Sequence, residues 1–138
     1  MGADVILYLW IAIGSALGGV GRFACSRYVA LRFGETFPWG TLIVNITGSF
    51  VIGFFATMTG ADGRLIVAPE FRQFVMVGIC GGYTTFSSFS LQTLELVRNR
   101  DFAEAVANVL LSILLCMVAV WLGYVAASFF NGMMAIAG

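Results

Sequence analysis

Residues 81–89 read Gly-Gly-Tyr-Thr-Thr-Phe-Ser-Ser-Phe and lie within an uncharged, otherwise apolar run from Gln73 to Leu94. That run is long enough to cross a bilayer, because a spanning helix needs about 20 apolar residues. Its centre nevertheless contains two adjacent glycines and four Ser or Thr hydroxyls. Non-helical backbone at membrane depth is tolerated only where protein buries it or where it lines a polar cavity. The stretch therefore predicts a transmembrane helix that is broken at mid-membrane.

A break of this kind frees backbone carbonyl and N–H groups, which are the groups that bind ions in channels and transporters. We therefore expect the functional centre of the protein at residues 81–89.

The composition is that of an integral membrane protein. Of 138 residues, 60% are hydrophobic and 10% are charged, and the mean hydropathy is +0.97. Soluble domains carry about 25% charged residues. Net charge is zero and the chain has no basic patch, which argues against nucleic acid as a partner.

Four uncharged runs are long enough to span a membrane, with short charged connections between them. They predict an all-α protein with one four-helix transmembrane domain over residues 1–138. The approximate spans are 4–31, 38–60, 71–97 and 103–130.

A single bundle of four helices is too thin to enclose a pore, so we expect an oligomer. Small residues let helices approach closely in membranes. The candidates for such an interface are Gly14, Gly18, Gly21, Gly48 and Gly53.

The charge bias of the connections is weak. With Arg22 set aside as intramembrane, the first and third connections carry Arg27, Arg32, Arg98 and Arg100, and the opposite side carries Arg64 and Arg72. Since the Lys/Arg bias of short loops sets orientation, this pattern is compatible with insertion in both orientations and hence with an antiparallel homodimer. The alternative is an ordinary topology with a weak bias.

Catalytic and metal-binding motifs are lacking in the sequence. It contains no His, which rules out His-based catalysis. The three cysteines, Cys25, Cys80 and Cys116, do not have the spacing of a zinc site. We expect a protein that is not an enzyme.

Two stripes of neutral polar residues repeat at i, i+4, i+8 and so share one helix face each. They are Thr41, Asn45 and Ser49, and Asn108, Ser112 and Cys116. Such residues often join helices to one another. Beside a broken helix, the two stripes are also the expected wall of an ion pathway.

Phe86 and Phe89 follow the predicted break at i, i+3 and lie among hydroxyl residues, including Thr85. Aromatic residues at this spacing usually serve packing. The positive edge of a ring can also solvate a small anion.

Arg22 is the one charge that falls well inside a predicted span and away from the span ends. It either faces the bundle interior, as functional intramembrane charges do, or extends toward the interface. No acidic residue lies centrally in any span, which favours passive movement of an anion over proton-coupled export.

Three motifs together resemble the Fluc (CrcB) fluoride channels of microbes. They are Gly18-Gly-Val-Gly-Arg22, Gly40-Thr-Leu-Ile-Val-Asn-Ile-Thr-Gly48 and Gly81-Gly-Tyr-Thr-Thr-Phe-Ser-Ser-Phe89. The resemblance implies a dual-topology antiparallel homodimer that exports fluoride passively across the bacterial cytoplasmic (inner) membrane. The rival function is a small secondary transporter of another anion or of a cationic drug, and a third is a non-transporting assembly subunit.

The resemblance also implies roles for individual residues. The expected fluoride-pore residues are Asn45, Phe86, Phe89, Ser112 and Asn108, with Thr85 beside them. Gly81 and Thr84 match the positions whose backbone carbonyls hold a structural Na⁺ at the dimer interface. Arg22, Gly48 and Gly82 match structural positions. Cys116 and Gln92 depart from the family pattern, which often has Ser and an acidic residue there, so the polar track is thinner in this chain.

Overall fold

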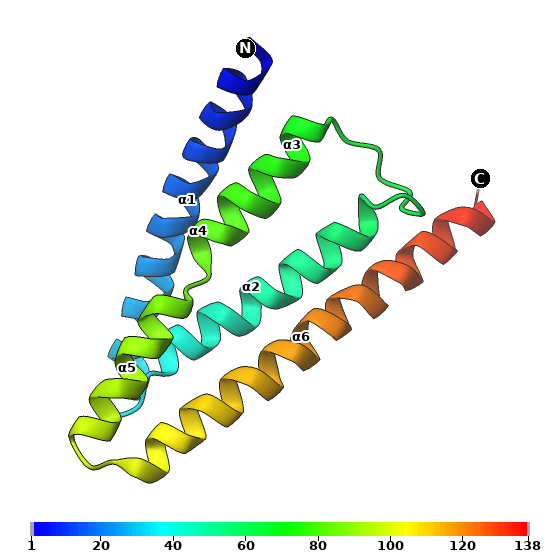
Figure 1. Ribbon diagram of the computed structural model, residues 1–138. Coiled ribbons are helices and arrows are strands. Elements are labelled where there is room, and N and C mark those ends of the chain that lie inside the picture. The colour runs from blue at the N-terminus through cyan, green and yellow to red at the C-terminus, as the bar shows by residue number, and fades with distance from the viewer. Residues whose placement is uncertain (1, 138) are drawn as a thin grey trace.

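The computed structural model describes residues 2–137, and these are helical apart from short connections (Figure 1). The elements are α1 (Gly2–Phe33), α2 (Trp39–Met58), α3 (Pro69–Gln73), the π-helical segment η1 (Phe74–Cys80), α4 (Gly81–Tyr83), α5 (Phe86–Arg98) and α6 (Phe102–Ala137). The described residues form no strand, which confirms the predicted all-α class.

Four helical stretches are long and apolar enough to cross a membrane: Asp4–Phe33, Trp39–Met58, Pro69–Arg98 and Phe102–Ile136. The fourth continues past the predicted end at residue 130, because residues 131–136 extend the apolar helix without a charge or a proline. The chain therefore has the architecture of a multi-pass membrane protein.

Glycine and proline residues set helix boundaries at the α1–α2 connection and, at the opposite end of α2, at the start of α3. Gly34 follows α1 with φ at +81°, a conformation that costs glycine little. Pro38 precedes α2, and Pro69 occupies the first turn of α3, where its missing N–H is harmless. These residues keep the connections short and the helices adjacent.

Two helix pairs make up the bundle. α2 runs beside α6 along most of its length, and α1 runs beside α3, η1 and α4 (Figure 1). Glycines permit both contacts. A Cβ on Gly14 would lie 2.9 Å from Cα of Gly78, and one on Gly123 would lie 2.8 Å from the backbone nitrogen of Phe54. Such backbone proximity maximises dispersion contacts between helices in lipid.

The glycines that the sequence suggested for an oligomer interface contact the same chain instead. Gly14 and Gly18 face η1 and α4, Gly21 and Gly48 face Tyr83, and Gly53 faces Val120 of α6. The predicted role is therefore wrong. Glycine spacing shows that a helix is closely approached, but it does not identify which helix approaches it.

The third membrane-length stretch changes conformation twice along its course. In η1 the hydrogen bonds widen, and the N–H of Gly81 reaches back to the carbonyl of Met76. α4 ends at Tyr83, and Thr84 (φ −75°, ψ 158°) and Thr85 (φ −153°, ψ 115°) are extended before α5 begins. We call Thr84 and Thr85 the interruption.

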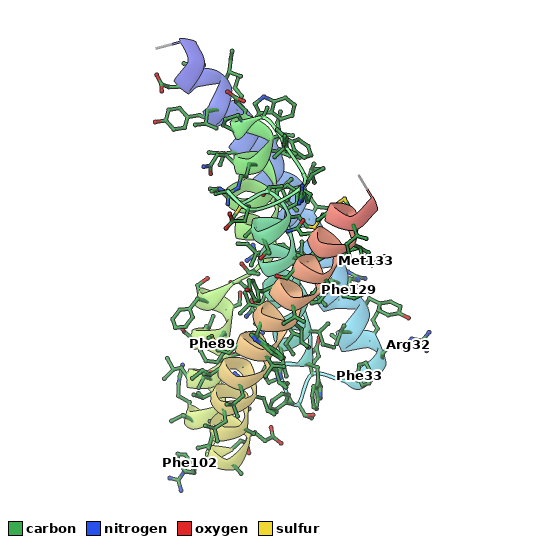
Figure 2. All side chains as sticks on the ribbon, turned by 90° about the vertical axis from the view of Figure 1, so that its right-hand side faces the viewer. Arg32, Phe33, Phe89, Phe102, Phe129 and Met133 are labelled. Atoms are coloured by element: carbon green, nitrogen blue, oxygen red, sulfur yellow. The ribbon has the colours of Figure 1, made fainter. Side chains whose placement is uncertain are left out.

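The outer surface is apolar along the whole length of the bundle. Figure 2 shows Phe102 near one end of α6 and Phe129 and Met133 toward the other, and these side chains are 59%, 66% and 51% exposed. Soluble monomers rarely expose apolar patches larger than a few hundred Å². These faces therefore suit contact with lipid or with other protein.

Candidate functional site

A groove of about 440 Å³ lies at the interruption, between α2, α4, α5 and α6. Its walls combine residues from both polar stripes with both phenylalanines. The lining residues are Asn45, Gly48, Ser49, Ile52, Cys80, Gly81, Thr84, Thr85, Phe86, Phe89, Ser112, Ile113, Cys116 and Met117. None of these side chains carries a formal charge, so the groove offers polar groups without a strong electrostatic trap.

Asn45 holds the interruption from the neighbouring helix α2. Its Oδ1 accepts a hydrogen bond from the backbone N–H of Thr85 at 2.8 Å. Its Nδ2 donates to the backbone carbonyl of Thr85 at 3.0 Å. Both backbone groups of an extended residue are thereby satisfied by one side chain from 40 positions away. One N–H of the Asn45 amide is left over from these two bonds.

Thr85 in turn starts α5. Its Oγ1 accepts a hydrogen bond from the backbone N–H of Ser88 at 3.2 Å and lies 3.1 Å from the Ser88 hydroxyl. This is the N-cap arrangement that satisfies one of the free N–H groups at a helix start. Thr85 is 7% exposed. Asn45 holds its backbone, and the bonds to Ser88 of α5 hold its side chain.

The carbonyls that lose their ordinary helical donors at this break include those of Gly81 and Thr84. In a continuous helix the carbonyl of Gly81 would accept from the N–H of Thr85, and that of Thr84 from the N–H of Ser88. Thr85 donates to Asn45 instead, and Ser88 donates to the side chain of Thr85. Gly81 and Thr84 thus carry carbonyls that the interruption makes available to another ligand.

Phe86 and Phe89 lie together in the groove wall, with ring centroids 5.4 Å apart and an interplanar angle of 50°. The tilt leaves ring edges free to contact a third group. Phe86 is 79% exposed, which is unusual for an aromatic side chain next to a polar interruption. Phe89 lies on α5 beside α6 in Figure 2 and is partly buried.

The polar stripe of α6 serves two different roles: one residue joins helices, and two line the groove. Asn108 is 2% exposed and donates through Nδ2 to the Thr93 hydroxyl at 2.9 Å. Thr93 then donates to the carbonyl of Phe89. Asn108 therefore joins α6 to α5 and does not line the groove. Ser112 and Cys116, one and two turns later, do line it.

Thr93 is a residue that sequence reasoning missed. It follows Phe89 by four positions and so lies on the same face of α5. That spacing could have identified it as the partner of a buried amide.

Arg22 lies within α1 and is partly buried. It lines neither the groove nor the larger cavity at the end of α1. The structure therefore does not bring it to the groove. Gly82, in contrast, has no space for a side chain, because a Cβ there would lie 2.8 Å from Cα of Ser15 in α1. Gly48 is similarly closed by Thr84 and Tyr83.

A second, larger cavity of about 1140 Å³ opens at the end of the molecule where α1 and α5 finish and α2 and α6 begin. We call it the vestibule. Four carboxylates and one guanidinium line it: Glu35, Glu95, Asp101, Glu104 and Arg27.

The vestibule leads toward the groove along two helices. Thr41 lines the vestibule one turn before Asn45 on α2, and Gln92 lines it one turn after Phe89 on α5. Gln92 Oε1 is buried and has no hydrogen-bond partner among residues 2–137. The two cavities thus follow one another along α2 and α5, with neutral polar side chains at their junction.

Comparison with known proteins identifies the family. Residues 9–124 match the family described as CrcB-like protein, Camphor Resistance (CrcB). A protein of Opitutus terrae named fluoride-specific ion channel FluC is 61% identical over 127 residues, which cover 92% of this chain and 96% of that protein. Proteins of the same name from Methylocella silvestris and Rhodospirillum rubrum are 56% and 55% identical over 91% and 90% of this chain and 96% of each relative. With a match over most of its length and its three motifs in order, this chain belongs to the CrcB family.

Proposed function

We propose that this protein is a passive, fluoride-selective ion channel of the bacterial cytoplasmic membrane. The observation that carries the proposal is the groove itself, whose uncharged wall combines amide, hydroxyl and ring-edge groups at a helix interruption. The relatives named fluoride-specific ion channel support it.

The chemistry of fluoride fits this wall. The ion is compact and strongly hydrated, so a pore must replace its water with a series of hydrogen-bond donors that each bind weakly enough to release it. The free N–H of Asn45, the hydroxyls of Ser49 and Ser112, and the edges of Phe86 and Phe89 supply such donors in sequence.

We propose that the working form is an antiparallel, dual-topology homodimer, with the Thr84–Thr85 interruption at mid-membrane depth. The groove is open on one side, Phe86 is 79% exposed beside it, and one bundle encloses no pore. A second copy inserted the opposite way would cover the groove and would bring the two interruptions to the same depth. The weak Arg bias is compatible with this arrangement.

The decisive test is fluoride efflux from liposomes that contain the purified protein, driven by a K⁺ gradient with valinomycin. A channel will release fluoride under this electrical driving force alone, with no gradient of a coupled ion such as H⁺ across the membrane. The rival, a secondary transporter, would show strict dependence on such a gradient, and an assembly subunit would show no flux. The absence of any carboxylate among the groove residues favours the channel.

The carbonyls of Gly81 and Thr84 fit the structural Na⁺ that the family resemblance implies. Their helical donors are diverted, as shown above, and an unsatisfied carbonyl in a dry interior costs several kcal/mol (about 2–7). An axial cation between two antiparallel copies would satisfy both pairs at once. Its role is structural, and it supplies positive charge beside the anion path.

We therefore expect fluoride efflux to stop when Na⁺ is replaced by a large organic cation and to return when Na⁺ is added. Thr84→Ser should keep the requirement, because the carbonyl does the binding. Gly81→Val should abolish conduction without unfolding the protomer, since the nearest atom to a Cβ at Gly81 is the Met76 carbonyl oxygen at 3.9 Å. Full efflux without Na⁺, in protein shown by anomalous scattering to hold no ion, would contradict the proposal.

The vestibule gives a further prediction about access of the anion. A unit charge about 10 Å from the path changes the local anion concentration about twofold in water at low ionic strength. Glu95→Gln and Glu104→Gln should each raise efflux by about that factor at limiting fluoride, and the gain should vanish in high salt because the charges are screened.

Two matched variants control for charge alone. Glu70→Gln removes the same charge outside the vestibule and should change efflux less, whereas Arg27→Gln should lower it. A fall in efflux for the Glu95 and Glu104 variants would show that these carboxylates assist the ion instead.

A further inference from the structure

We infer that Asn45 acts through the backbone of Thr85: it is a positioning residue that couples the anion groove to the Na⁺ site. The inference rests on the proposed function, and it assigns to Asn45 a role other than that of a fluoride ligand. It starts from the two hydrogen bonds that join the Asn45 amide to one backbone residue, at 2.8 and 3.0 Å.

The first consequence of this pair of hydrogen bonds concerns the Na⁺ site. The N–H of Thr85 can donate to one strong acceptor at a time. While it donates to Asn45 Oδ1, it cannot close a helical bond to the carbonyl of Gly81, four residues earlier. Asn45 therefore keeps the Gly81 carbonyl free for a cation. If the amide were removed, the Thr85 N–H could return to that carbonyl and extend α4 across the interruption.

The second consequence concerns the groove. Phe86 follows Thr85 directly, and the Thr85 hydroxyl caps the helix that carries both phenylalanines. The direction in which α5 leaves the interruption is thus set by a residue whose backbone Asn45 holds. A change at Asn45 moves the ring edges and the carbonyls together, which a ligand role alone would not do.

The other groove residues do not share this position. Ser49 lies one turn further along the same stripe of α2 and also lines the groove. Within residues 2–137, no hydrogen bond joins its side chain to the interruption. Ser49→Ala is therefore the matched control for loss of a polar group from the wall of α2.

A backbone substitution separates the two roles of Asn45. Replacing Thr85 by its α-hydroxy acid analogue changes the amide N–H to an ester oxygen and leaves the side chain intact. It removes the bond to Asn45 Oδ1. It also turns the Thr84 carbonyl into a weaker ester acceptor, an effect on the Na⁺ site that does not depend on Asn45. Two quantities are measured for each protein: fluoride efflux, and the rise in thermal stability of the purified dimer on titration with Na⁺.

In the unmodified background we expect the ester to lower efflux and to raise the half-saturating Na⁺ concentration for stabilisation. Each change should be about three- to tenfold, the range for loss of one hydrogen bond. Asn45→Ala should do the same. In that background the ester should add only the smaller effect of the weakened Thr84 carbonyl. Ser49→Ala should leave the Na⁺ titration unchanged.

Asn45→Asp provides a second background in case Asn45→Ala does not assemble. The carboxylate keeps the acceptor for the Thr85 N–H, so the ester should still reduce Na⁺ affinity there. An ester without effect in the unmodified protein, or one whose effects are as large in the Asn45→Ala background as in the unmodified protein, would overturn the inference. Either result leaves the proposed function standing, whereas loss of efflux from the unmodified protein would remove the proposed function itself.

Discussion

Replacing Phe86 or Phe89 with isoleucine is expected to lower fluoride efflux by up to about tenfold while the dimer remains intact. Isoleucine keeps apolar bulk but has no positive ring edge, and an aromatic contact of this kind is worth about 0.5–1.5 kcal/mol, or about tenfold at its upper end. Phe86 is 79% exposed in the single chain, so its replacement leaves no cavity within the protomer.

The measurement is efflux from liposomes at matched protein content, with size-exclusion chromatography to confirm the dimer. Phe129→Ile is the matched control. Phe129 is 66% exposed on α6 and lines neither cavity, so this variant should conduct normally. If both groove variants conducted as well as the unmodified protein, the rings would serve packing only.

Locking the orientation of the chain should abolish its function when the variant is expressed alone. Phe33 and Phe102 lie at the same side of the bundle as four of the arginines, and both are more than half exposed and outside the vestibule. Phe33→Lys with Phe102→Lys raises the bias on that side to about six positive residues against two, which is a clear instruction for insertion. An antiparallel partner would then be missing.

An oppositely biased variant should restore function on co-expression. Ala61→Lys, Leu65→Lys and Ile66→Lys add positive charge to the α2–α3 connection, and Arg32→Gln, Arg98→Gln and Arg100→Gln remove it from the other side. The variant then carries about five positive residues against one, a clear bias in the opposite direction. Growth in fluoride of cells that lack their own exporter is the measurement, with reporter fusions to confirm orientation. Full protection by either locked variant alone would rule out the antiparallel dimer.

The parts of this protein that sequence patterns predicted are those that depend on neighbours along the chain. The glycine pair and hydroxyls at residues 81–89 pointed to the site, and the extended Thr84–Thr85 pair lies within that stretch. The polar stripes could be placed on helix faces because α-helical spacing is regular. Two of the three residues in each stripe line the groove, namely Asn45, Ser49, Ser112 and Cys116.

Where sequence reasoning fell short, the missing information was the identity of a partner. The glycines of α1 and α2 were assigned to a neighbouring copy, although the structure places them against η1, α4 and α6. Asn108 was placed on the pore face, and the sequence did not identify Thr93 as its hydrogen-bond partner. In both cases the residue type indicated close or polar contact correctly, but the rotation of each helix about its axis decides what is contacted.

The sequence by itself determined the membrane class, the four apolar helices and the family, because hydropathy, length and motif order are properties of contiguous residues. Only the tertiary structure decided that Asn45 holds Thr85 across 40 positions, and that a vestibule lined by carboxylates leads to an uncharged groove. These features arise where separate helices cross. Helix crossing depends on packing among all the side chains at once, and no single stretch of the chain encodes it.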